Sequence, residues 1–141
     1  MSVNNTTKNS EIPLLSNIKE ILYNSVDKYK DNIAFTIKIK KGENVEYINK
    51  TYESFLNDIN SFGASLYCLG LKSGRVAIMG KNRYEWAVAY LSNLLGGIIS
   101  IPIDKDLQLG ELEDSLIRSK AKALVFDKAH KELIDEIKKR N

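Results

Sequence analysis

Residues 75–104 constrain the fold more than any other segment of this sequence. A short apolar run at 76–79 stops at Gly80, a long apolar segment covers 86–95, and a second, β-branched run follows at 98–103. This order predicts a strand, a helix and a second strand. Because both strand segments are apolar almost throughout, they are typical of strands that are buried on two faces in a parallel sheet. Parallel neighbours need a crossover connection, and the helix supplies it.

The ends of the helix in this segment carry signals of their own. Asn82 can cap the helix, and Glu85 stands three residues later, which is the spacing of a capping box. Gly96 and Gly97 suit the other end, where a residue in the left-handed conformation closes many helices. No polar stripe is visible at 86–91. We therefore expect this helix to be buried on most sides.

The part of the chain before this segment predicts a tail, a helix and a hairpin. Residues 1–13 are expected to be a disordered tail, because Asn, Thr and Ser dominate them without an apolar period. Ser16 is positioned to cap a helix whose apolar residues recur at Ile18, Leu22, Val26 and Tyr29. Strands at 33–39 and 45–48 then predict an antiparallel hairpin around a turn at 41–44.

The clearest amphipathic helix begins after Thr51 and ends before Gly70. Its apolar face is one continuous stripe made of Tyr52, Phe55, Ile59, Phe62, Leu66 and Leu69. Beyond residue 104 the sequence predicts a helix at 109–119, a third strand at 123–126 and a last helix that includes Ala129, Leu133, Ile134 and Ile137. The predicted fold class is α/β, with a small parallel sheet joined by βαβ crossovers and an antiparallel hairpin.

Composition limits the class of protein. A chain of 141 residues suffices for one domain with its own core. Its net charge of 21 − 18 = +3 comes from interspersed residues, so no nucleic-acid partner is predicted. One cysteine excludes an internal disulfide and a cysteine-based zinc site. No apolar run approaches the ~20 residues of a transmembrane segment, the N-terminus lacks a secretory core, and we expect a cytoplasmic protein.

The residues that could take part in catalysis or ligand binding stand apart from one another in the sequence. Gly80 lies between a strand and a helix, where phosphate-binding loops occur, but GKNRYE lacks the other glycines of such a loop. A plain turn is the favoured interpretation. His130, the only histidine, has no Cys or Ser partner nearby and is interpreted as a solvated surface residue. Cys68 is interpreted as a small core hydrophobe.

Charged and aromatic residues also receive structural interpretations. Asp104 and Asp106 follow a predicted strand end and could bind a metal, but an acidic pair in a loop is the favoured interpretation. Arg83, Glu85 and Trp86 are explained by helix capping and packing. We therefore assign no catalytic, cofactor-binding or metal-binding residue from the sequence.

Three sequence motifs occur in a fixed order from about residue 16 onward. Residues 50–55 read KTYESF, residues 94–104 read LLGGIISIPID, and between them VAI at 76–78 is followed by NRYEW at 82–86. The first two resemble the first and second core motifs of the adenylate-forming enzymes, which include acyl-CoA synthetases and the adenylation domains of peptide synthetases. The intervening stretch resembles acyl-CoA ligases, although Tyr84 stands where that family usually has proline.

This resemblance implies that residues 14–141 are part of the N-terminal domain of a longer AMP-binding enzyme, of the long-chain fatty acid–CoA ligase type. Such an enzyme uses ATP, Mg²⁺ and coenzyme A to convert a carboxylate first into an acyl-adenylate and then into a thioester. The phosphate loop, the adenine and ribose motifs and the catalytic lysine of the family have no counterpart in these 141 residues. No position inherits a catalytic role, and the chain alone is expected to be inactive.

Two alternatives remain open at this point. The chain could be a stand-alone α/β binding or interaction module derived from the same fold, or an unrelated nucleotide-binding domain, which the missing glycine loop disfavours. For the fragment interpretation, the expected partner is the remainder of the enzyme or a second copy of the chain. We expect an apolar patch beside the helix at 86–95 or the open sheet, or self-association that hides it, and Trp86, Tyr90 and Leu94 should belong to the core or to that patch. The full-length enzyme is expected in the cytoplasm or at the membrane periphery.

Overall fold

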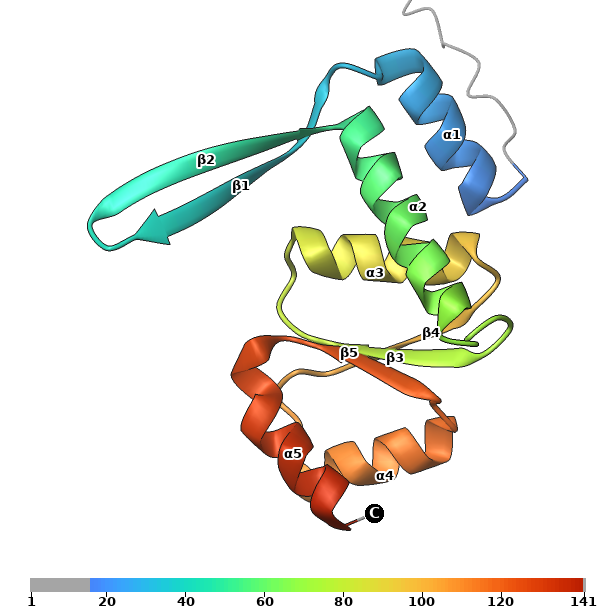
Figure 1. Ribbon diagram of the computed structural model, residues 1–141, viewed down its shortest axis with the longest axis vertical. Helices are drawn as coiled ribbons and strands as arrows, with labels where there is room; N and C mark the ends of the chain where they lie inside the picture. Colours follow the sequence, from blue (N-terminus) through green and yellow to red (C-terminus); the bar gives the residue numbers. More distant parts are fainter. Residues whose placement is uncertain (1–15, 141) are drawn as a thin grey trace, which may run out of the picture.

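The computed structural model describes residues 16–140, so the tail predicted at 1–13 lies outside the described residues. Helices cover both faces of a small sheet, with α2 and α3 on one face and α4 and α5 on the other, while a hairpin projects from the body (Figure 1). The elements are α1 (Ile18–Tyr29), β1 (Ile33–Lys41), β2 (Asn44–Thr51), α2 (Tyr52–Cys68), β3 (Arg75–Met79), α3 (Tyr84–Leu95), β4 (Ile99–Ile103), α4 (Leu109–Ser119), β5 (Ala123–Phe126), the 3-10 helix η1 (Lys128–His130) and α5 (Lys131–Arg140).

The predicted parallel sheet is confirmed. Its strand order is β4-β3-β5, and Val76 of the central strand lies opposite Ser100 on one side and Ala123 on the other. Val76 and Ala77 are 0% exposed and Ile78 is 2% exposed, because helices cover the sheet on both faces. This two-sided burial explains why the strand reads as a continuous apolar run.

The predicted antiparallel hairpin is also confirmed, and it lies apart from the parallel sheet. Its strands are longer than the sequence indicated, because the ladder extends from the pair Lys41–Asn44 to the pair Ile33–Thr51. Gly42 occupies the turn with a φ of +64°, a conformation that glycine adopts without a steric cost.

The core is divided between the two faces of the sheet. On one face, α1, α2 and α3 enclose a cluster made of Leu22, Phe55, Ile59, Tyr84 and Val88, and the hairpin adds Phe35 and Ile37 to it. On the opposite face, α4 and α5 cover a cluster made of Met79, Leu112, Ile134 and Ile137.

The start of α3 differs from the prediction. The N-cap residue is Arg83, without a side-chain capping bond, so the capping box predicted from Asn82 and Glu85 is wrong. Glu85 cannot reach back because its carboxylate accepts a hydrogen bond from Arg83 Nε at 2.8 Å. The other end follows the prediction: Gly97 has a φ of +65°, and Ile98 N–H donates to the carbonyl oxygen of Asn93 at 2.8 Å.

Two other helix ends need correction. Asn17, not Ser16, is the N-cap of α1, and its Oδ1 accepts the backbone N–H of Glu20 at 2.9 Å. The Ser16 hydroxyl instead donates to the Glu20 carboxylate at 2.8 Å. At the end of α2, Leu69 does not continue the apolar stripe, because it is the C-cap residue and is exposed. The predicted cap at Thr51 is confirmed, since its hydroxyl accepts the N–H of Ser54.

Polar as well as apolar side chains of helix α3 are buried. Ser92 and Asn93 are both buried. The Ser92 hydroxyl lies 2.8 Å from the carbonyl oxygen of Ile59 on α2, and Asn93 Nδ2 donates to Ser100 Oγ at 3.1 Å. These bonds offset part of the cost of burying the two side chains, since a buried polar group without a partner is costly. Asn93 Oδ1 is buried without a partner among residues 16–140.

The apolar patch expected beside α3 or the open sheet stays a prediction. Trp86, Tyr90 and Leu94 are only partly exposed, and Trp86 stacks on Tyr90 with ring centroids 5.0 Å apart. Large apolar side chains are exposed on α1 and the hairpin, namely Ile18, Ile21, Tyr23, Tyr29, Ile33, Val45, Tyr47 and Ile48, and elsewhere at Tyr67, Leu69, Ile99 and Ile117.

A polar network connects the hairpin to the body at a single carboxylate. Lys50 on β2 donates to Asp58 Oδ2 on α2 at 2.7 Å, and the Tyr84 hydroxyl on α3 donates to the same oxygen at 2.6 Å. The hydrogen bond from Lys50, followed by that from Tyr84, holds the pKa of Asp58 below its usual value. Burial, followed by the bond to Asp58, raises the pKa of Tyr84 far above its usual value.

Removing the centre of the α4–α5 cluster should destabilise the fold. Leu112 is 0% exposed, so Leu112→Ala is expected to reduce the free energy of unfolding by about 2–5 kcal/mol through lost burial and a residual cavity. Urea denaturation followed by circular dichroism measures the change. Ile117→Ala is the matched control, because Ile117 lies on the same helix with 62% exposure, and its effect should stay within about 0.5 kcal/mol. Equal losses in both variants would contradict the packing described.

The Asp58 network should make stability depend on pH in the acid range. Because the pKa of Asp58 is lower in the folded chain than in the unfolded chain, its ionised carboxylate stabilises the fold above the unfolded value of about 3.9. This stabilisation is lost as pH falls through the folded pKa. The difference in unfolding free energy between wild type and Asp58→Asn should therefore be largest near neutral pH and should shrink below pH ~4.

Urea denaturation across this pH range provides the measurement for Asp58. Asp114→Asn is a suitable control, because Asp114 is exposed on α4, away from the network. A wild-type minus Asp58→Asn difference that stays constant from neutral to acid pH would be inconsistent with the network.

Candidate functional site

The carboxyl ends of the three parallel strands meet at one edge of the sheet, where α/β folds commonly bind ligands. β3 is followed there by Gly80, β4 by Asp104 and β5 by Asp127. The sequence indicated Gly80 and Asp104 but missed Asp127. The parallel register provides a signal that could have identified it, because Met79 lies opposite Phe126 and so brings the residues after both strands together.

The Asp127 carboxylate lies against the backbone of the Gly80 loop. Its Oδ2 accepts the backbone N–H of Lys81 at 2.7 Å, and its side chain is 17% exposed. A Cβ atom at Gly80 would lie 3.0 Å from the same carboxylate. A side chain at position 80 would therefore have to displace the Asp127 carboxylate slightly. The interpretation of Gly80 as a plain turn agrees with this geometry, because the Lys81 amide is hydrogen-bonded within the chain.

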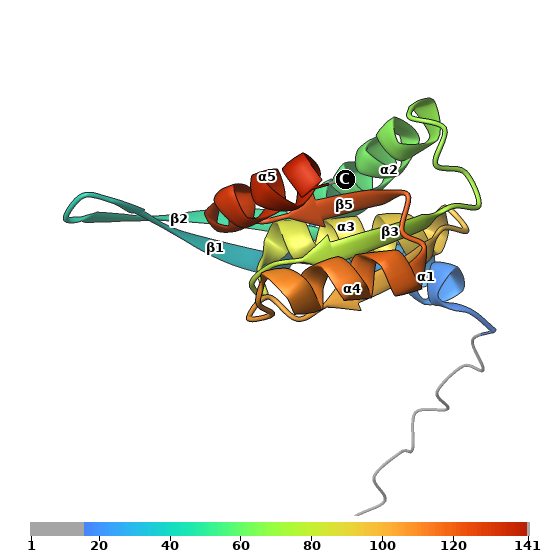
Figure 2. The same cartoon turned by 90° about the horizontal axis from the view of Figure 1, so that it is seen from below.

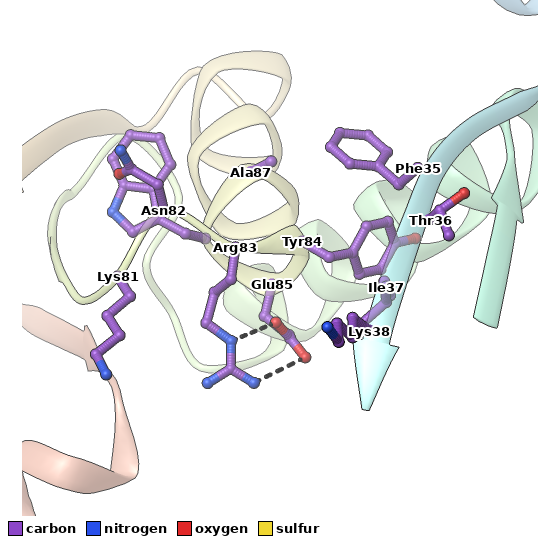
Figure 3. Close-up of a pocket in the computed structure, with 11 residues that line it drawn as sticks. Phe35, Thr36, Ile37, Lys38, Lys81, Asn82, Arg83, Tyr84, Glu85 and Ala87 are labelled. Atoms are coloured by element: carbon purple, nitrogen blue, oxygen red, sulfur yellow. Dashed lines mark hydrogen bonds and ion pairs between the residues drawn. The ribbon is translucent and has the colours of Figure 1, made fainter. Parts of the chain in front are cut away.

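Arg83 forms ion pairs with two acidic side chains beside the Gly80 loop. Its Nε lies 2.8 Å from Glu85 Oε2, and its Nη1 lies 3.4 Å from Asp127 Oδ1. The hydrogen bond from Arg83 to Glu85 is the main reason why the pKa of Arg83 is raised. Figure 3 shows the guanidinium turned toward Glu85 at the first turn of α3. Ion pairing, more than the predicted helix capping, therefore explains Arg83 and Glu85.

Asp104 and Asp106 shape the loop that follows β4. Asp104 Oδ1 accepts the backbone N–H of Asp106 at 2.9 Å, and Asp106 pairs with Lys105. The favoured interpretation as a structural acidic pair agrees with these contacts. Within residues 16–140, no group of three or more His, Cys, Asp or Glu side chains is arranged to hold a metal ion.

His130 and Cys68 both differ from their predicted surroundings. The His130 ring is partly buried, not solvated, and its Nε2 lies 3.1 Å from the carbonyl oxygen of Lys105. This contact connects η1 to the loop after β4. Cys68 is exposed at the last residue of α2, so it is not a core hydrophobe. The His130 ring thus lies at the loop that contains Asp104 and Asp106.

An open groove of about 940 Å³ lies between the hairpin and the start of α3 (Figure 3). The hairpin side contributes Phe35, Thr36, Ile37 and Lys38, and the other side contributes the residues from Lys81 to Ala87. Aromatic and aliphatic side chains therefore share this groove with lysines from both walls. This mixture of apolar and charged side chains is suited to binding a ligand.

Within residues 16–140, no helix combines the length and the apolar character that are needed to cross a membrane.

The candidate residues at the sheet edge and in the groove take part in turns, ion pairs and packing. The geometry by itself supports a structural or binding role.

Comparison with known proteins identifies relatives of this chain. Its sequence is 31% identical over 111 residues to the mitochondrial medium-chain acyl-CoA ligase ACSF2 of Danio rerio, a match that covers 78% of this chain and 17% of that protein. The chain thus spans about a sixth of the length of this curated relative.

Solved structures share the fold at lower sequence identity. The anthranilate CoA ligase AuaEII in complex with anthranoyl-AMP is 23% identical with a TM-score of 0.73, and the match covers 92% of this chain and 24% of that one. The N-terminal domain of FACL13 from Mycobacterium tuberculosis is 21% identical with a TM-score of 0.73, covering 88% of this chain and 30% of that one.

The match to a family confirms the resemblance noted from the three sequence motifs. The family described as AMP-binding enzyme matches residues 22–141. This range includes α2, the whole parallel sheet and the helices that cover it. The chain belongs to the AMP-binding enzyme family.

Proposed function

We propose that this chain is the N-terminal structural portion of an ATP-dependent acyl-CoA synthetase, with residues 14–141 as part of its N-terminal domain. The observation that carries the proposal is the match of the family over residues 22–141, together with the small share of its relatives that the chain covers. In this role the sheet and the helices of the chain form packed layers that contact the rest of the enzyme.

The reaction proposed for the full-length enzyme has two steps. A fatty acid carboxylate and ATP give an acyl-adenylate and pyrophosphate, and coenzyme A then forms the thioester and releases AMP. Mg²⁺ would neutralise phosphate charge in the first step. The residues of this chain take no part in these steps, because Asp127 already binds the backbone N–H that a phosphate would need at the Gly80 loop. We therefore propose that the chain alone is inactive.

For its partners, we propose the remainder of the enzyme or, in its absence, a second copy of this chain. Exposed side chains such as Val45, Tyr47 and Ile48 on the hairpin support this proposal, since soluble monomers seldom leave large apolar patches uncovered. We place the full-length enzyme in the cytoplasm or at the membrane periphery. The competing candidate is a stand-alone binding module, which the groove between the hairpin and α3 favours.

The purified chain should not release pyrophosphate from ATP. Incubation with ATP, Mg²⁺, coenzyme A and a panel of fatty acids should give the same signal in a coupled pyrophosphate assay as a sample without protein. The expected reason is that the Lys81 amide at the Gly80 loop is already bound to Asp127. Release that rises in proportion to chain concentration and requires a fatty acid would refute the proposed inactivity.

The isolated chain should associate with itself as its concentration rises. Sizing chromatography with light scattering is expected to show an increasing mass, because association removes exposed apolar side chains of the hairpin from water. Tyr47→Ser should shift the equilibrium toward monomer, since Tyr47 is 62% exposed. Ile117→Ser is the matched control with equal exposure on α4. A monomer at every concentration would favour the stand-alone module.

A further inference from the structure

The hairpin is a long arm that is attached to the body mainly at its base. Figure 2 shows it extending well past the helices. At the base, Tyr52 N–H donates to the carbonyl oxygen of Asn32, and Glu53 N–H donates to that of Lys30, both at 3.1 Å. Farther out, Tyr47 is exposed. An isolated two-stranded hairpin is marginally stable in water, so its position depends on these few attachments.

One face of the hairpin carries the attachments made by side chains. Phe35 on β1 lies opposite Lys50 on β2, and side chains at such paired positions point to the same face of the hairpin. The Phe35 ring packs against the rings of Phe55 and Tyr84, with centroids 4.8 and 5.3 Å away. These apolar contacts hold the hairpin against α2 and α3, but the hydrophobic effect is non-directional and does not fix an angle.

The polar network supplies directional contacts between the hairpin and helices α2 and α3. Lys50, Asp58 and Tyr84 belong to three different elements and meet at one oxygen, Asp58 Oδ2. The Lys50 ammonium also lies 5.2 Å from the centroid of the Tyr84 ring. Charge-assisted hydrogen bonds are short and depend on geometry, so two of them at one atom restrict rotation of the hairpin relative to both helices.

We propose that Lys50, Asp58 and Tyr84 form a latch that fixes the angle of the hairpin against α2 and α3 and so sets the width of the adjacent groove. The groove has Phe35 and Ile37 of the hairpin on one side and Tyr84 and Trp86 of α3 on the other. Its width must therefore follow the angle of the hairpin. When the latch is broken, the hairpin moves as an arm about its base while the parallel sheet and its helices keep their structure.

The distance between the hairpin and the body tests this proposal directly. The background is Cys68→Ser, because Cys68 is the single cysteine and is exposed. Nitroxide labels are attached at Glu43→Cys in the hairpin turn and at Glu132→Cys on α5, both exposed positions. The labelled chain is diluted with unlabelled chain, so that double electron–electron resonance reports the distance within one molecule.

Two conservative substitutions break the latch while they preserve packing. Lys50→Met retains the apolar stem and removes the ammonium, and Tyr84→Phe retains the ring and removes the hydroxyl. The labelled wild type is expected to give one narrow distance peak, and each variant is expected to lose it and give a broad distribution. The matched control, Asp135→Ala, removes the partner of Lys131 on α5, remote from the hairpin, and should leave the narrow peak unchanged.

Circular dichroism and amide exchange in α4 and β5 verify that the body of each variant is folded. Broad distributions in both Lys50→Met and Tyr84→Phe, with protected amides in the body, support the latch. A narrow peak at the wild-type distance in either variant overturns it. The same broadening in Asp135→Ala also overturns it, because the hairpin would then be responding to any lost ion pair.

Discussion

The burial of β3 on both of its faces is the constraint on which the rest of the structure depends. Val76 and Ala77 have no exposed surface, and this requires helices above and below the sheet. Helices α3 and α4 satisfy the requirement as crossovers to β4 and β5. Right-handed crossovers favour this arrangement of parallel strands. Burial of β3 on both faces therefore goes with one helical layer on each side of the sheet. The hairpin stands outside this constraint and is attached by Phe35 and by the Lys50–Asp58–Tyr84 network.

The carboxyl edge of the sheet is held by hydrogen bonds and ion pairs among its own residues. The edge is the usual place for a phosphate, and Gly80 lies at the expected position. Asp127, however, accepts the amide of Lys81, and Arg83 is paired with Glu85. These contacts stabilise the connection between β3 and α3.

The pattern of apolar residues predicted the helices, the strands and the strand pairing. A continuous apolar run such as 76–79 indicates a strand that is buried on both faces. The pattern did not predict details that depend on partners distant in sequence. Glu85 pairs with Arg83 instead of capping α3, and His130 is partly buried because its ring reaches the loop after β4. Asp127 follows the predicted strand at 123–126, but its role depends on the pairing of β3 with β5, which lies outside any local pattern. The exposure of Leu69 and Cys68 likewise follows from the end of α2, which a periodic pattern locates only approximately.

The central claim is that the Gly80 loop of this chain is a closed structural turn and that the chain lacks a nucleotide site of its own. Nuclear magnetic resonance titration of ¹⁵N-labelled chain with Mg²⁺–ATP tests it most directly, with the backbone amides of Gly80, Lys81 and Arg83 as reporters. The predicted result is the absence of saturable chemical-shift changes at these amides, because the Lys81 amide is bound to Asp127. Saturable changes at Gly80 and Lys81 that are abolished in a Lys81→Ala variant would show that the loop binds phosphate and would contradict the claim.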